Sequence, residues 1–258
     1  EEDVIKAGVL DMKMTIQAVE KTYELLGKGQ IINPPKTHIG MPIGSGANWN
    51  SFFNSMPCYI GGDINVGGTK WAAESRRNSS IPGIPYGIDI TILSDPETVL
   101  PFCILDGTLI TAMRTSAVAG VFAKYTAPKN TETVTLVGAG VIGRTMIMAV
   151  CESLPAVKKI YLCDMNLAKA KALAADYKDV YSVEIVPTGD ARTAALDSQV
   201  VITETTASSP FIDKSWIKKG MTVINMGSYE ADLDVVSSSD VIAVSYTHLR
   251  AHETLRHL

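Results

Sequence analysis

The chain has 258 residues, 46% of them hydrophobic, a length that fits two domains with sizeable cores better than one. Its formal net charge is only −4, and its Lys and Arg residues are spread out, so a nucleic acid partner is not expected. No apolar run reaches the roughly 18 residues of a membrane-spanning helix, and the acidic start Glu1-Glu2-Asp3 is unlike a secretory signal. We therefore expect a cytoplasmic protein without a membrane partner.

The cysteines and histidines give no metal or disulfide pattern. The four cysteines show no CxxC spacing, and two of them lie in apolar runs, where a thiol behaves as a small hydrophobic group. His248 and His252 are one helical turn apart, but no acidic cluster or apolar stripe accompanies them. No metal site is predicted.

The first half of the chain combines one helix with several strands. Ile16, Val19, Tyr23 and Leu26 have helical spacing, which predicts a helix over 11–27 with Asp11 as its cap. A loop is predicted over 33–55, followed by short strands at 58–60, 64–66, 88–93 and 102–105 and a helix over 107–127. This order predicts an α+β domain over 1–128, which a linker at 128–130 separates from the second half.

A glycine-rich turn opens the second half. The apolar run 133–137 reads as a strand and residues 144–154 as a helix, and GxGxxG lies between them. The first glycine allows a tight turn, the second leaves room for a pyrophosphate, and the third lets helix and strand pack closely. Backbone N–H groups at the helix start would then face the phosphates. The expected cofactor contacts are Gly138, Ala139, Gly140, Val141, Ile142 and Gly143.

The acid after the next strand indicates which dinucleotide binds. A strand at 160–163 ends at Asp164, about 20 residues after the turn, where such units place the carboxylate that accepts the ribose hydroxyls. This carboxylate would repel the 2′-phosphate of NADP, which favours NAD. Lys169 and Lys171 lie close enough in sequence to leave NADP as the alternative. A Rossmann domain is thus predicted over 131–244.

The last segment, 245–258, differs from everything before it. It contains three of the four histidines and resembles translated sequencing-adaptor read-through. We expect it to be a non-native tail that truncates the protein.

Several motifs in this order resemble the ornithine cyclodeaminase and mu-crystallin family. They are Gly68-Thr69-Lys70-Trp71, the segment 93–98, Leu105-Asp106-Gly107, the segment 108–117 that contains Arg114-Thr115, and the glycine turn. The resemblance covers residues 1–244. It implies an α/β fold with a Rossmann domain and an α+β substrate and dimerisation domain, in a homodimer that continues beyond this sequence.

The resemblance also implies the site residues. Lys70 and Arg114 match positions that bind the substrate carboxylate, and Lys36 stands where relatives often carry Arg. Three cations around one carboxylate are chemically sensible, although Lys70 taken alone would be read as a surface lysine. Thr115 and Gly227 are expected next to the cofactor.

Two departures bear on the reaction. Tyr229 stands where ornithine cyclodeaminase has an acid, so Glu230 or Asp232 would have to supply the proton transfer. Tyr86 falls near the position of a Thr that helps to bind the substrate in that enzyme. The leading hypothesis is therefore an oxidoreductase that moves a hydride between a nicotinamide and the α-carbon of an amino or imino acid. The alternatives are ornithine cyclodeaminase itself and a non-catalytic NAD(P)H-binding or accessory protein.

Overall fold

The structure is a computed structural model that describes residues 1–41, 51–227 and 230–244. The chain divides into two compact units, Glu1–Arg114 and Thr115–Leu258, and the division falls inside helix α3 (Thr108–Thr126). The domain limits predicted at 128 and 131 lie just after this helix and stay a prediction. The tail 245–258 lies outside the described residues.

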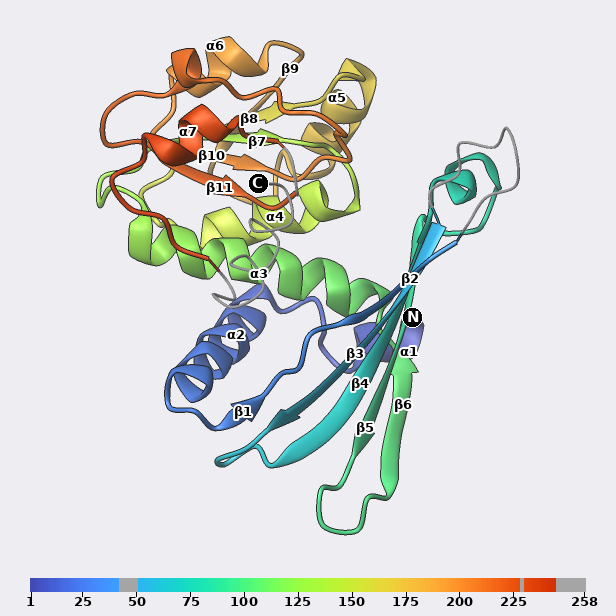
Figure 1. Ribbon diagram of the computed structural model, residues 1–258. Coiled ribbons are helices and arrows are strands. Elements are labelled where there is room, and N and C mark those ends of the chain that lie inside the picture. Colours follow the sequence, from blue (N-terminus) through green and yellow to red (C-terminus); the bar gives the residue numbers. More distant parts are fainter. Residues whose placement is uncertain (42–50, 228–229, 245–258) are drawn as a thin grey trace. The chain divides into compact units, whose positions relative to one another are not determined.

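The first unit is built on an antiparallel sheet with the order β1-β3-β4-β5-β6, and β2 also pairs with β3 (Figure 1). Its elements are α1 (Glu2–Lys6), α2 (Met12–Gly27), β1 (Ile31–Ile32), β2 (Thr37–Gly40), β3 (Ser51–Ile60), β4 (Val66–Ser75), the 3-10 helix η1 (Arg76–Ser80), β5 (Gly87–Ser94), β6 (Pro101–Asp106) and the first part of α3.

Both long helices predicted for this half are confirmed. The Asp11 side chain caps α2 by accepting a hydrogen bond from the Met14 N–H at 2.8 Å, as the sequence predicts. Helix α3 covers the predicted span to within a residue at each end.

Two predictions for this half are wrong. The segment 33–55 is not a continuous loop, because β2 and the start of β3 lie in it and pair antiparallel. The strand predicted at 64–66 is wrong for its first two residues, because β4 starts only at Val66. Asn65 before it has a left-handed φ of 46°, which a strand residue does not adopt. Strand β4 consequently contains Lys70, for which the sequence pattern predicts no strand.

The second unit has a five-stranded parallel sheet with the order β11-β10-β7-β8-β9. The predicted strand, turn and helix around the GxGxxG motif are confirmed, although the helix starts at Val141 rather than Arg144. The elements after α3 are β7 (Thr133–Val137), α4 (Val141–Ser153), β8 (Lys159–Cys163), α5 (Leu167–Asp176), β9 (Glu184–Thr188), α6 (Ala191–Leu196), β10 (Val200–Thr203), the 3-10 helix η2 (Lys214–Trp216), β11 (Thr222–Asn225) and α7 (Leu233–Ser237).

The central strands of this sheet are buried on both faces. Val134, Thr135 and Leu136 are consecutive and none exposes any surface, although neighbouring strand residues point to opposite faces. This is the pattern of a parallel sheet covered by helices on both sides. In the described part of the chain, no helix combines the length and the hydropathy needed to cross a bilayer.

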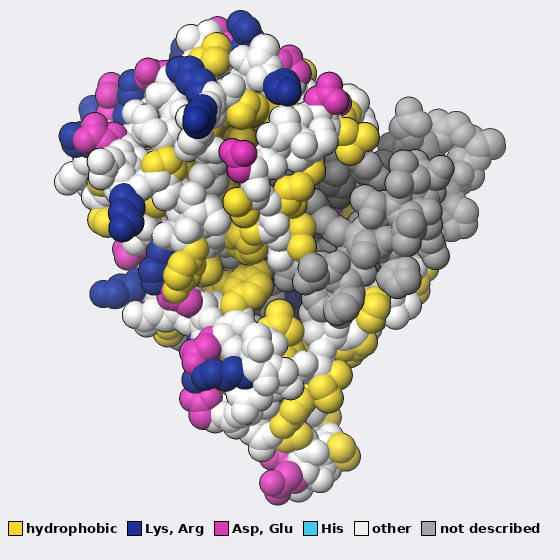
Figure 2. All heavy atoms as spheres, turned by 60° about the vertical axis from the view of Figure 1, so that its left-hand side comes forward, with side chains coloured by type: hydrophobic (Ala, Val, Ile, Leu, Met, Phe, Trp, Pro, Cys, Tyr) yellow, Lys and Arg dark blue, Asp and Glu magenta, His cyan; other side chains and the backbone are white. Residues whose placement is uncertain are grey.

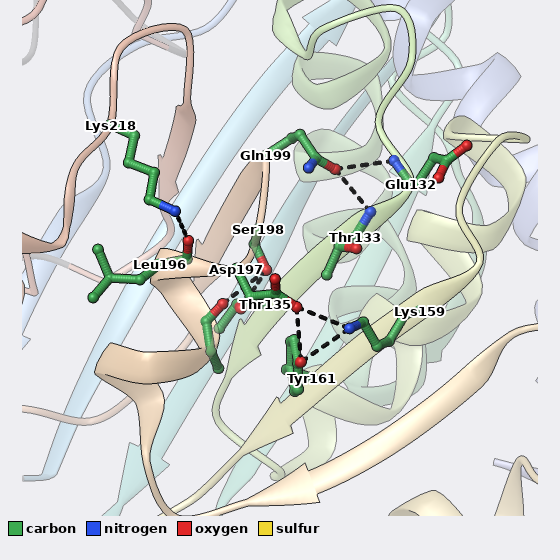
Figure 3. A network of polar contacts seen from close by, with 11 residues as sticks. Glu132, Thr133, Thr135, Lys159, Tyr161, Leu196, Asp197, Ser198, Gln199 and Lys218 are labelled. Atoms are coloured by element: carbon green, nitrogen blue, oxygen red, sulfur yellow. Dashed lines mark hydrogen bonds and ion pairs between the residues drawn. The ribbon is translucent and has the colours of Figure 1, made fainter.

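A polar network ties the unit together away from the glycine turn (Figure 3). The Asp197 carboxylate accepts hydrogen bonds from Lys159 Nζ and the Tyr161 hydroxyl, both at 2.8 Å. The Gln199 amide oxygen accepts from the backbone N–H of Thr133 at 2.9 Å. We infer that this polar network supports the sheet.

On the face drawn in Figure 2, Lys and Arg side chains of this unit are interspersed with Asp and Glu.

Candidate functional site

The three glycines of the turn meet three different surroundings. Gly138 has a φ of +126°, and a Cβ on it would lie 2.7 Å from the Glu204 carbonyl oxygen. A Cβ on Gly143 would lie 2.2 Å from the carbonyl oxygen of Gly138, so only glycine lets α4 start this close to the strand. At Gly140 a Cβ would meet no atom of the described residues within 4 Å. The backbone at Gly140 is therefore open, as the bound pyrophosphate of a dinucleotide requires.

Asp164 lies beside this turn. Its Oδ2 accepts a hydrogen bond from the Ala139 N–H at 3.0 Å, and its Oδ1 accepts from the Asn166 N–H at 2.7 Å. Each carboxylate oxygen can accept a further hydrogen bond, such as one from a ribose hydroxyl. The carboxylate thus stands at the end of β8, next to the strand that carries the glycines.

The other predicted cofactor residues lie in the same unit. Val141 is largely exposed in the first turn of α4, and Thr115 is half-buried in α3. The Ile142 carbonyl accepts a 3.0 Å hydrogen bond from Thr145. The Gly227 N–H donates to a carboxyl oxygen of Glu230 at 2.7 Å, which gives Gly227 a structural contact. Cofactor contacts of these residues stay a prediction.

A charged cluster lies on one face of the antiparallel sheet in the first unit. Lys70 in β4 donates hydrogen bonds to Thr111 Oγ1 at 3.1 Å and to Asp89 Oδ2 at 3.4 Å. The Thr111 hydroxyl also donates to Asp89, whose side chain is only 7% exposed. Burial, and then the positive charge of Arg114, lowers the pKa of Lys70 below its ordinary value, and Asp89 opposes this.

Arg114 and Lys36 complete the predicted set of cations. Arg114 keeps exposed surface, and desolvation lowers its pKa while Asp89 and Tyr23 oppose the shift, so the guanidinium stays charged. Lys36 is exposed, and its charge acts on Glu74. Lys70, Arg114 and Lys36 thus all interact with acids of one cluster. Their binding of a substrate carboxylate stays a prediction.

Two acids of this cluster were missed by the sequence analysis. Asp89 belongs to β5, and the register pairs it with Ala72, two residues from Lys70 on the same face of β4. Glu74 lies two residues further along that face, and its pKa is raised by burial and then by Asp89. The available signal was a charged residue inside an apolar strand, at Asp89.

Of the two acids after β11, Glu230 has a structural role. Glu230 is fully buried and accepts hydrogen bonds from Thr203, Thr205 and Gly227, so it cannot reach a substrate. Asp232 is at the N-cap position of α7, although its side chain makes no capping bond. Tyr229 lies outside the described residues. Glu230 is therefore unsuited to the proton transfer considered from the sequence, and that role stays a prediction for Asp232.

The parallel sheet with a glycine turn at its centre defines an α/β protein with a dinucleotide-binding Rossmann unit and a second unit, which confirms the predicted fold class. The chain belongs to the ornithine cyclodeaminase/mu-crystallin family, which matches residues 3–252. The resemblance drawn from the motifs is therefore confirmed. The match extends into the segment 245–258, whose foreign origin stays a prediction.

Several relatives are oxidoreductases by name. The structure of Δ1-pyrroline-2-carboxylate reductase from Thermococcus litoralis, in complex with NADH and L-proline, has a TM-score of 0.81 and 32% identity, covering 90% of this chain and 71% of that one. N-((2S)-2-amino-2-carboxyethyl)-L-glutamate dehydrogenase of Staphylococcus aureus is 26% identical, covering 94% of this chain and 72% of that protein. Alanine dehydrogenase of Archaeoglobus fulgidus is 25% identical, covering 91% and 70%.

Proposed function

We propose that this chain is an NAD-dependent oxidoreductase that transfers a hydride between the nicotinamide C4 and the α-carbon of an amino or imino acid. The observation that carries the proposal is the glycine turn, open at Gly140 and bonded to Asp164. Relatives with dehydrogenase and imine reductase activities support the same chemistry.

The residues of the second unit fit a nicotinamide dinucleotide. The backbone at Gly140 would receive the pyrophosphate, and Asp164 would accept the ribose hydroxyls. The bound dinucleotide would supply or accept the hydride. The protein's own contribution is to hold the substrate carbon within range, which accounts for most of the rate gain in such reactions.

The first unit would bind the amino-acid end of the substrate. Lys36, Lys70 and Arg114 offer a forked guanidinium and two ammonium groups to the α-carboxylate. In imine reduction Lys70 would give a proton to the substrate nitrogen and regain one from solvent. Its lowered pKa brings this exchange closer to neutral pH.

The test is NADH binding followed by turnover. The chain should quench or shift NADH fluorescence, and it should oxidise NADH with Δ1-pyrroline-2-carboxylate or with pyruvate plus ammonia. Proline and ammonia formed from ornithine without net NADH would identify a cyclodeaminase instead. Tight NADH binding without turnover over a broad panel of amino and keto acids would contradict the proposal and favour an accessory protein.

The choice of NAD over NADP is testable at Asp164. An Asp164→Ser variant should improve NADPH affinity relative to NADH by about tenfold or more, because the carboxylate that repels a 2′-phosphate is gone. Both dissociation constants are read by fluorescence titration. The exposed Asp179→Asn is the control and should leave the ratio unchanged. An unchanged ratio in Asp164→Ser would place the 2′-hydroxyl elsewhere.

We also propose a cytoplasmic homodimer that uses the second face of the antiparallel sheet. Ile90 and Ile104 on this face are 46% and 70% exposed. Apolar side chains continue around them, since Ile90 pairs with Trp71, and Trp71 stacks on Phe53 at 5.4 Å. A contiguous apolar face of this kind is typical of a protein interface.

The dimer prediction is tested by charge insertion. Ile90→Glu with Ile104→Glu should convert a dimer to a monomer in light scattering, because two carboxylates would be buried without partners at the interface. The control is Val180→Glu, which adds a charge at a 59% exposed position of the other unit. A monomeric unmodified chain would contradict the proposal.

A further inference from the structure

Glu204 lies at the point of the parallel sheet where ligands bind in such folds. It follows β10, and its N–H donates to the Val137 carbonyl at the end of β7 at 3.0 Å. Strands β7 and β10 are neighbours in the sheet. Strands β8 and β9 follow on the β7 side of this pair, and β11 lies on the β10 side. This reversal of strand order is the switch point at which α/β sheets take up a dinucleotide.

The carboxyl group of Glu204 faces the inner side of the glycine turn. A Cβ on Gly138 would lie 2.9 Å from its Cγ, and a Cβ on Gly143 would lie 3.3 Å from its Oε1. The residue keeps some exposed surface, but both carboxyl oxygens are buried and have no hydrogen-bond partner among the described residues. Burial without hydrogen-bond partners strongly disfavours the charged form of a carboxyl group.

A second buried acid, Glu230, lies close enough to act on Glu204. It accepts hydrogen bonds from the hydroxyls of Thr203 and Thr205 at 2.7 and 2.6 Å and from the N–H of Gly227 at 2.7 Å, and the Thr205 N–H donates as well. Four donors thus satisfy the Glu230 carboxyl oxygens as acceptors. The two carboxyl groups thus lie in unlike surroundings, since Glu230 is hydrogen-bonded through both oxygens and Glu204 has no partner among the described residues.

On balance, the groups around the turn favour the neutral form of Glu204. Burial, and then the charge of Glu230, raises the pKa of Glu204 well above its ordinary value. The positive end of the α4 dipole acts in the opposite direction. Asp164 is engaged by the Ala139 and Asn166 N–H groups, and burial raises the pKa of the Cys163 thiol to about 12, so it stays neutral.

We propose that Glu204 is a positioning residue of the dinucleotide site, which supports the glycine turn as a neutral acid and weakens dinucleotide binding when it loses its proton. Ionisation would place an uncompensated negative charge beneath the turn that receives the pyrophosphate. The inference rests on the proposed function, because it requires a pyrophosphate at this turn.

The test is the pH dependence of NADH binding, measured by fluorescence from about pH 5.5 to about pH 9.5. The unmodified chain should lose about tenfold or more in affinity as the pH rises through the Glu204 transition. Glu204→Gln keeps a neutral group of the same shape, so its affinity should match the low-pH affinity of the unmodified chain and change less than about twofold. The control Glu184→Gln, at an exposed position of β9, should follow the unmodified chain.

Two outcomes would overturn the inference while leaving the proposed function intact. One is a Glu204→Gln variant that binds NADH with the same pH dependence as the unmodified chain. The other comes from infrared spectra at neutral pH, which require no binding. The unmodified chain should show a protonated-carboxyl band that Glu204→Gln lacks, and absence of this band from the unmodified chain would overturn the inference. Failure of the unmodified chain and of Glu184→Gln to bind NADH at any pH would instead contradict the proposed function.

Discussion

A Lys70→Met variant should lose at least about a hundredfold in turnover while NADH still binds. Methionine fills similar space but removes both the positive charge offered to the substrate carboxylate and the proton for its nitrogen. Turnover is followed by NADH oxidation with the best substrate of the panel, and NADH affinity by fluorescence. Turnover within tenfold of the unmodified chain would exclude Lys70 from the reaction.

The control for this variant separates chemistry from folding. Without Lys70, the nearly buried Asp89 loses an ion-pair partner, and this should lower the free energy of unfolding by about 3 kcal/mol. Lys70→Met with Asp89→Asn removes the Asp89 charge as well, so it should recover most of the stability and remain inactive. Lys21→Met, whose ion pair with Asp63 is solvent-exposed, should leave activity unchanged.

A Gly140→Ala variant should fold normally and lose about a hundredfold in NADH affinity. The added methyl group meets no atom within 4 Å in the part of the chain that the structure describes. The backbone at Gly140, with a φ of −91°, suits an L residue. The methyl group would occupy the space that the pyrophosphate needs. Unchanged melting temperature with lost NADH binding is the expected pair of results.

Two other glycine-to-alanine variants serve as comparisons for Gly140→Ala. Gly143→Ala should lower the free energy of unfolding by about 2 kcal/mol or more, because its Cβ would collide with the Gly138 carbonyl oxygen. Gly189→Ala adds a methyl group in open space after β9 and should change neither stability nor NADH affinity. Normal NADH binding by Gly140→Ala would contradict a pyrophosphate at this turn.

The dinucleotide part of the site follows from local sequence, whereas the charged cluster does not. The GxGxxG turn joins a strand to a helix within a few residues, so its conformation is fixed by the glycines themselves. Lys70 and Asp89 meet only because β4 and β5 pair in one particular register. A shift of that register by one residue would turn Asp89 to the opposite face.

The sequence by itself determined the family, the Rossmann unit, the glycine turn and the acid at Asp164, because these depend on short spacings and on residue types that the backbone requires. The tertiary structure alone decided that Asp89 and Glu74 share a face with Lys70 and that Glu230 is a buried acceptor of four hydrogen bonds. It also decided that the Glu204 carboxyl group lies beneath the turn with no hydrogen-bond partner in the described part of the chain. Burial and charge environment arise from contacts between distant segments, and spacing along the chain does not encode them.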